Sequence, residues 1–274
     1  MPLSFFLKPA EKSAALGDIY PSYRSCAGKI KASPWTLAAP SYVWPDTVAA
    51  NCRLLEGLFP EVGILLFETE SSLEYTDSDL PPWLSDLDLR YHVHLPLDLP
   101  WGKGFDAAFS KIEKLAAKVA FLSPRAFVLH PPPERSLVAE TALRWRKLGL
   151  DPEILLLENT RECGALQTLE YASALGLGLC LDLGHLLAYE QFSPAGEAFW
   201  DRVRMLHVSA PEGPGQSGHL CLSRLDAPGR DLLRSMLARI RRDTVITLEL
   251  FNEPDLFTSV DVLSAWSREW GFVR

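Results

Sequence analysis

The sequence predicts an α/β protein of a single domain, in which eight parallel strands close into a (β/α)8 barrel, the TIM barrel. Short apolar runs without alternation, such as residues 62–67 (VGILLF), are typical of strands buried on both faces of a parallel sheet. Stretches with helical periodicity separate these runs. Eight such repeats over residues 35–274 fit the usual barrel length of about 250 residues.

The expected elements alternate along the chain. The expected strands are residues 35–39, 62–67, 89–95, 126–129, 154–157, 177–183, 205–208 and 244–250. A helix begins after the first strand, with Asp46 as its N-cap and Val48, Cys52 and Leu55 on one face. Further helices are expected at residues 106–122, 136–148, 166–175, 228–241 and 259–270. Residues 69–85 break the rhythm, and we expect only a short helix there, near residues 82–86.

Residues 1–34 show no clear periodicity, so we expect an irregular N-terminal extension ahead of a catalytic barrel formed by residues 35–274. A doubly wound open sheet is the alternative fold. Against it, no GxGxxG follows the first strand and the chain contains no P-loop.

The composition limits the partners. Lys plus Arg number 27 and Asp plus Glu 35, a net charge of −8, which disfavours binding to a phosphate backbone. No run of about 18 apolar residues occurs, so no membrane span is expected. The N-terminal apolar stretch is too short for a signal peptide, since Lys8 and Glu11 interrupt it. Five scattered cysteines without CxxC spacing favour reduced thiols and a cytoplasmic location.

Seven consecutive expected strands end at an acidic residue or a histidine. These residues are Glu68, His94, His130, Glu158, Asp182, His207 and Glu249. The carboxyl ends of barrel strands converge on one mouth, where catalytic residues lie. His185 follows the sixth strand and His219 follows a glycine-rich loop, so five of the six histidines are expected at this mouth. Only His92 is expected to point away from it.

Imidazole and carboxylate without thiolate are ligands for zinc, manganese, iron or cobalt. Five histidines and several carboxylates exceed the needs of one ion, so two or three clustered ions are expected. Such clusters activate water and hold a phosphoryl group during in-line displacement. The sequence has no GxSxG elbow, which disfavours a serine hydrolase, and we interpret Cys163 as an ordinary loop cysteine. Arg161 is the better candidate for contacting a substrate anion.

Five motifs in order carry a family resemblance over about residues 35–270. They are His130-Pro131, Leu157-Glu158-Asn159-Thr160, Asp182-Leu183-Gly184-His185, Leu206-His207-Val208 and Leu248-Glu249. Together they resemble the xylose-isomerase-like TIM barrels, the superfamily that includes the endonuclease IV type of abasic-site nuclease.

The resemblance implies the ligand sets. Glu158, Asp182, His207 and Glu249 would hold the shared metal, and His94 and His130 with a bridging Glu158 would hold a second. His185 and His219 would serve a third ion, but Ser217 stands where the nucleases have an Asp. We therefore expect two divalent ions, with zinc or manganese favoured and a third in doubt.

Three further stretches, residues 39–43, 66–70 and 92–101, look like the cobamide-remodelling phosphodiesterases of this superfamily. Those enzymes hydrolyse the phosphodiester in the nucleotide loop of a cobamide. This likeness implies a small-molecule phosphodiester substrate, a corrinoid in that subfamily, with no nucleic acid or membrane as partner. Glu68, Trp101 and Arg161 are the expected substrate contacts.

The leading hypothesis is a metal-dependent phosphodiesterase, with Glu158, Glu249 and His185 as its catalytic residues. The alternative is a sugar or sugar-phosphate isomerase or epimerase, in which Glu158 and Glu249 exchange a proton beside a carbonyl that one metal polarises. A barrel that binds a metal or a corrinoid without turnover is the third. DNA repair is disfavoured, since no basic stripe with interleaved aromatics occurs.

Overall fold

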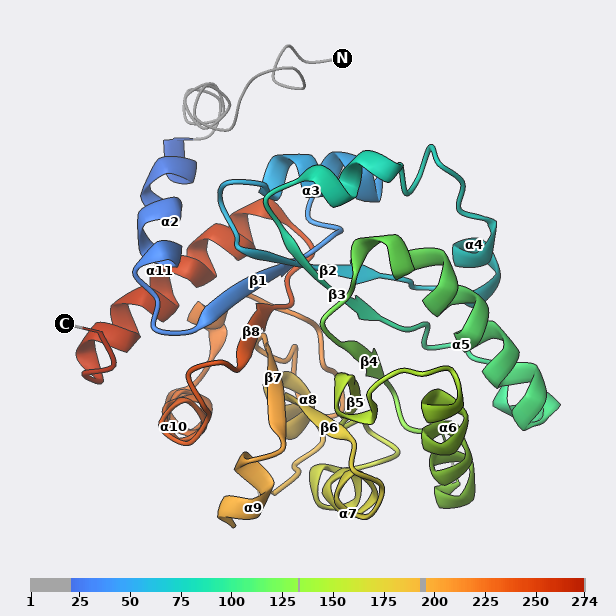
Figure 1. The fold of residues 1–274 in the computed structure, drawn as a ribbon. Coiled ribbons are helices and arrows are strands. Elements are labelled where there is room, and N and C mark those ends of the chain that lie inside the picture. The colour runs from blue at the N-terminus through green and yellow to red at the C-terminus, as the bar shows by residue number, and fades with distance from the viewer. Residues whose placement is uncertain (1–20, 133, 193–195, 274) are drawn as a thin grey trace.

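A computed structural model describes residues 21–132, 134–192 and 196–273 of the chain. Its eight strands pair in parallel in the order β1 to β8, and β8 pairs with β1, so that the sheet closes into a barrel. Figure 1 shows the strands around a common centre with the helices outside them. The (β/α)8 fold predicted from the sequence is therefore confirmed, and the open-sheet alternative is wrong.

The strands lie within a few residues of their expected positions. They are β1 (Thr36–Pro40), β2 (Glu61–Leu65), β3 (Arg90–His94), β4 (Phe127–Leu129), β5 (Leu155–Glu158), β6 (Gly178–Asp182), β7 (Val203–Val208) and β8 (Val245–Leu248).

Longer helices follow most strands. They are α3 (Val48–Leu55), α5 (Phe105–Val119), α6 (Arg135–Lys147), α7 (Ala165–Leu175), α10 (Ala227–Leu237) and α11 (Glu253–Glu269). Shorter helices are α4 (Thr69–Glu74), α8 (Leu183–Ala188), α9 (Glu197–Trp200) and the 3-10 helix at Pro82–Asp86.

The expected N-cap of α3 was wrong by one residue. The side chain of Thr47 caps this helix and accepts from the amide of Ala50, while Asp46 accepts from the amide of Thr47. Only the 3-10 helix was expected within residues 69–85, so α4 is an addition to the sequence-based prediction. Its six residues are too few to show a helical period.

Residues 21–31 form α2 (Pro21–Lys31), so the expectation of an irregular extension is wrong for this part. Cys26 and Ile30, four positions apart, are buried, and Lys29 Nζ lies 2.7 Å from Asp261 of α11. Figure 1 shows α2 alongside α11. This packing partner lies more than 200 residues away, which explains why local periodicity missed the helix. Residues 1–20 lie outside the described residues.

The barrel interior changes from apolar to polar along β4, β5, β6 and β7. Ala126, Val128, Leu156, Cys180 and Met205 form a small buried cluster, apart from the larger core between strands and helices. Side chains two residues apart on a strand point to the same side. The next inward positions toward the carboxyl ends are therefore polar, namely His130, Glu158, Asp182 and His207. The apolar cluster thus forms the floor of the site described next.

No helix in the described part of the chain combines the length and apolarity that crossing a membrane requires.

Candidate metal centre

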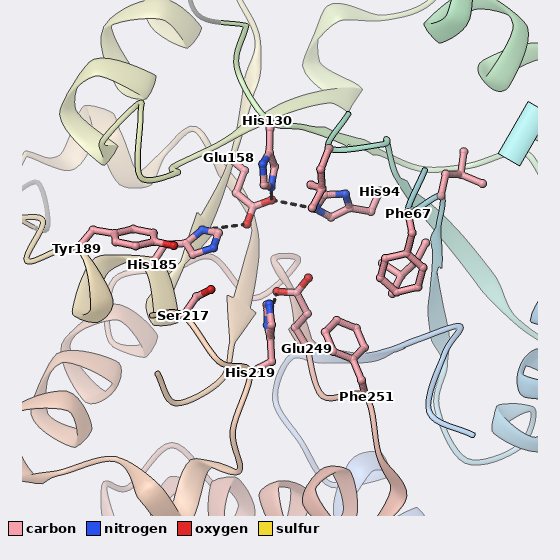
Figure 2. A pocket seen from close by; sticks show the side chains of 13 residues that line it. Phe67, His94, His130, Glu158, His185, Tyr189, Ser217, His219, Glu249 and Phe251 are labelled. Atoms are coloured by element: carbon pink, nitrogen blue, oxygen red, sulfur yellow. Dashed lines mark hydrogen bonds and ion pairs between the residues drawn. The ribbon is translucent and has the colours of Figure 1, made fainter. Parts of the chain in front are cut away.

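The carboxylate of Glu158, at the end of β5, lies among four imidazoles. One oxygen, Oε2, is 3.1 Å from His94 Nε2 and 3.4 Å from His130 Nε2. The other oxygen, Oε1, is 3.3 Å from His207 Nδ1 and 3.5 Å from His185 Nδ1. Figure 2 shows His94 and His130 converging on one side of this carboxylate. The two oxygens therefore face two separate groups of nitrogen donors.

Glu249 and Asp182 complete the cluster from β8 and β6. Glu249 Oε2 lies 3.4 Å from His207 Nδ1 and 3.4 Å from His219 Nδ1, and Asp182 Oδ2 lies 4.0 Å from His207 Nδ1. Potential ligand atoms of Glu158, Asp182, His207 and Glu249 all lie within 4.8 Å of one another.

The donors of His94, His130 and Glu158 form a second such group under the same 4.8 Å limit. Six of the eight metal ligands expected from the sequence thus come together at one end of the barrel, in two groups that share Glu158. His185 and His219 lie at its edge and line the cavity above it.

Backbone contacts orient several of these side chains. The Nδ1 atoms of His94 and His185 donate to the carbonyl oxygens of Leu95 and Asn159, both at 2.8 Å. A carbonyl oxygen only accepts, so each Nδ1 carries a proton, and Nε2 is the nitrogen left for a further partner. The Asp182 side chain accepts from the amide of His185 as the N-cap of α8. The turn that ends β6 therefore holds both residues in place.

Burial and mutual charge shift the pKa values of this cluster. Burial alone would raise the pKa of Glu158, but the charges of His207 and His130 bring it well below its ordinary value. Burial would lower the pKa of His94, but its hydrogen bond with Glu158 and the charge of Glu158 raise it. Burial raises the pKa of Asp182, and the charges of Glu158 and Glu249 raise it further. The carboxylates repel one another, which a bound cation would relieve.

The residues present fit divalent cations. Four buried polar atoms of the cluster have no hydrogen-bond partner among the described residues: Asp182 Oδ2, His207 Nδ1, His219 Nδ1 and Glu249 Oε2. Leaving such atoms without a partner is costly in a protein interior. Nitrogen and carboxylate donors suit zinc and manganese. An ion held by Glu158, Asp182, His207 and Glu249 would supply the missing partner to all of these atoms except His219 Nδ1.

A cavity of about 260 Å³ opens above the cluster. None of the three expected substrate contacts lines it. Glu68 is exposed and accepts from the hydroxyl of Ser71, Arg161 is exposed in the loop after β5, and Trp101 packs beside Phe105.

The residues that line this cavity beyond the ligands are Leu65, Leu66, Phe67, Leu97, Tyr189, Ser217 and Phe251. Phe67 and Leu97 lie in the stretches that carry the cobamide resemblance, but the sequence does not predict them, Tyr189 or Phe251 as cavity residues. Their signal was position alone, since Phe67 and Phe251 each follow a strand end by two or three residues.

We expected His92 to point away from the residues at the mouth. Its side chain instead points into the barrel interior, below His94. Two residues along a strand return to the same side, so the expectation was wrong by geometry. Its Nδ1 lies 2.9 Å from the buried Glu61 carboxylate. A Cβ at Gly63 would come within 2.5 Å of its Nε2. His92 is thus part of the barrel packing and stands outside the ligand cluster.

Solved structures share this fold over most of the chain. A D-tagatose 3-epimerase-like protein is 20% identical with a TM-score of 0.66, over 86% of this chain and 98% of the other. The probable 3-DHS dehydratase AsbF from Bacillus anthracis is 13% identical with a TM-score of 0.60, over 84% and 98%. IolI with a bound zinc atom is 13% identical with a TM-score of 0.56, over 86% and 96%.

No protein-family model matches the sequence, and no curated protein does. The likeness to these solved structures therefore concerns the (β/α)8 fold, which this chain shares with an epimerase-like protein, a dehydratase and a protein with bound zinc.

Proposed function

We propose that this protein is a phosphodiesterase that depends on two divalent ions. The observation that supports this proposal is that the two oxygens of Glu158 face different imidazoles. Oε2 faces His94 and His130, and Oε1 faces His207. On this proposal, His94, His130 and Glu158 hold one ion, and Glu158, Asp182, His207 and Glu249 hold the other. Two adjacent ions supply Lewis acidity, which activates water and neutralises charge on a phosphoryl group.

The remaining polar residues of the cavity would bind the phosphate. The Nδ1 proton of His185 is engaged by the carbonyl of Asn159, which leaves Nε2 for a substrate oxygen. His219 and Ser217 line the same cavity, and Ser217 offers a neutral hydroxyl where the related nucleases have an Asp. A hydroxyl at this position donates to a phosphate oxygen more readily than it binds a third ion.

A cobamide is the specific substrate that the sequence resemblance suggests. The phosphodiester of its nucleotide loop is a single anionic group flanked by two bulky parts. The cavity of about 260 Å³ holds only the part around the phosphate, so the rest of such a molecule would lie outside the mouth. Release of the nucleoside fragment from a cobamide, followed by chromatography, tests this substrate directly.

An isomerase or epimerase is the second candidate, because one of the two ligand groups is sufficient for it. Glu158, Asp182, His207 and Glu249 could hold one ion, and two of these carboxylates could exchange a proton with a bound sugar. One similar structure is that of a D-tagatose 3-epimerase-like protein. On this candidate, His94 and His130 have no role in holding metal.

The decisive experiment counts metal ions per chain and compares variants of the second group. We expect two ions in the wild type, one in the double variant His94→Ala/His130→Ala, and two in the control His92→Gln. Hydrolysis of bis(p-nitrophenyl) phosphate should be lost only in the double variant. One ion in the wild type, with solvent deuterium entering a ketose and no diester hydrolysis, would instead establish the epimerase.

A further inference from the structure

The mouth of the barrel has a polar half and an apolar half. The segments after β4 to β7 carry most of the ligands and His219. The segments after the neighbouring strands β8, β1, β2 and β3 carry Phe251, Tyr42, Phe67 and Leu97, beyond the ligands Glu249 and His94. We call these four side chains the apolar rim. Since their strands are consecutive in the closed barrel, the rim covers one continuous side of the mouth.

Ring contacts join the rim to the metal centre. Tyr42 meets Phe67 edge-on with centroids 5.3 Å apart, and Phe67 meets Phe251 at 6.0 Å. Phe251 in turn meets the imidazole of His219 at 4.9 Å. Figure 2 shows Phe67 and Phe251 on the side of the cavity opposite His185 and Tyr189. The aromatic surface therefore runs without a gap from the outer edge of the mouth to the site.

The rim is open to solvent. Tyr42 is 45% exposed, Phe67 41% and Leu97 59%, although these are large apolar side chains. These exposed side chains favour contact with another aromatic or planar apolar group. A cluster of exposed apolar side chains that borders a polar cavity is a common feature of ligand sites.

The charges of the cavity limit what lies beyond the phosphate. Among the described residues that line it, none is Lys or Arg. One phosphodiester could be neutralised by bound cations and imidazoles, but a second phosphate on the apolar side would have no partner. The substrate group on that side is therefore uncharged.

We infer that one ester group of the substrate is an uncharged aromatic or other planar apolar group that stacks on Phe67 and its rim neighbours. This inference rests on the proposed phosphodiesterase function and narrows its substrate class. It excludes diesters with small alkyl or polyanionic substituents as the preferred substrates. The apolar rim would select diesters by the ester group that stacks on it, whichever of the two P–O ester bonds is hydrolysed.

The test compares two pairs of probes on the metal-loaded protein. The binding pair is diphenyl phosphate and dimethyl phosphate, measured by calorimetry. The kinetic pair is bis(p-nitrophenyl) phosphate and methyl p-nitrophenyl phosphate, which share a leaving group. We expect a preference on the order of tenfold for the aryl member in binding, and most of it lost in Phe67→Ala. Phe121→Ala is the control, since Phe121 is 39% exposed and does not line the cavity.

The outcomes separate the two proposals. Diester hydrolysis without an aryl preference, or with a preference that Phe67→Ala leaves unchanged, refutes substrate binding by the apolar rim. The proposed phosphodiesterase function would remain. An aryl preference in binding that depends on Phe67, without hydrolysis of either diester, supports the rim and refutes the phosphodiesterase. If neither diphenyl phosphate nor dimethyl phosphate binds, substrate binding by the apolar rim is also refuted.

Discussion

Replacement of Asn159 by alanine should weaken metal binding, although this residue is not expected to touch a metal. Asn159 is buried, and its Oδ1 accepts from the amide of Asp182 at 2.7 Å. Its Nδ2 donates to the carbonyl of Asp182 at 3.2 Å and to Gln191 Oε1 at 3.1 Å. The Asn159 side chain therefore connects the end of β5 to the backbone amide and carbonyl of Asp182, a proposed metal ligand.

The structure gives the size of the effect. Alanine would leave the buried amide of Asp182 without its side-chain partner, at about 1–3 kcal/mol, with a smaller loss from the two hydrogen bonds that Nδ2 donates. We expect a total loss of about 2–4 kcal/mol in the free energy of unfolding, a decrease of roughly 3–7 °C in Tm for a chain of 274 residues. Groups that orient metal ligands typically contribute about 10–100-fold to metal affinity. The apparent Kd for metal should rise by that factor.

Thermal unfolding and metal titration, measured on the same preparations, check this prediction. Asn51→Ala is the matched control, because Asn51 is buried and accepts from the amides of Val43 and Trp44 at 2.8 and 2.9 Å. It lies on α3 and contacts none of the proposed ligands. The control should lose comparable stability and keep its metal affinity. If both variants lose affinity equally, or Asn159→Ala keeps it, the positioning role is refuted.

Two further predictions concern the barrel interior and the metal. Gly63→Ala should destabilise the protein by about 1–3 kcal/mol, because the added Cβ would come within 2.5 Å of His92 Nε2. Gly102→Ala, where no atom lies within 4 Å of the added Cβ, is its control in chemical unfolding, and equal midpoints would contradict the packing. Chelation should lower Tm reversibly, since an ion at 100 times its Kd adds about 2.7 kcal/mol to stability. A Tm indifferent to chelator and to restored zinc or manganese would argue against the metal centre.

The barrel was predictable from the sequence because its signal is local. A strand buried on both faces reads as an uninterrupted apolar run, whichever strands it pairs with. The helix α2 was not predictable in this way, because its buried face depends on α11 at the other end of the chain. Its apolar residues Cys26 and Ile30 are too few to stand out among the lysines around them.

The ligands were predictable as a set because the barrel topology turns a position in sequence into a position in space. Every strand ends at the same mouth, so residues such as His94 and Glu249 could be grouped without a contact map. No such rule places the residues that contact substrate. Glu68 and Arg161 stand near strand ends but point outside the cavity, whereas Phe67 and Phe251 enter it. The directions of loop side chains depend on turns that single residues do not specify.

The division of the donors is the strongest argument on the number of ions. One group offers three protein ligands and the other four. A site with three protein ligands keeps a position for water or substrate. If only the four-residue group held metal, His94 Nε2 and His130 Nε2 would both face the single oxygen Oε2 of Glu158. A barrel that needed one ion could place an apolar side chain at each position, as it does with Val128 one layer below His130. Two imidazoles aimed at a carboxylate that already serves another ion are better explained by a second ion between them.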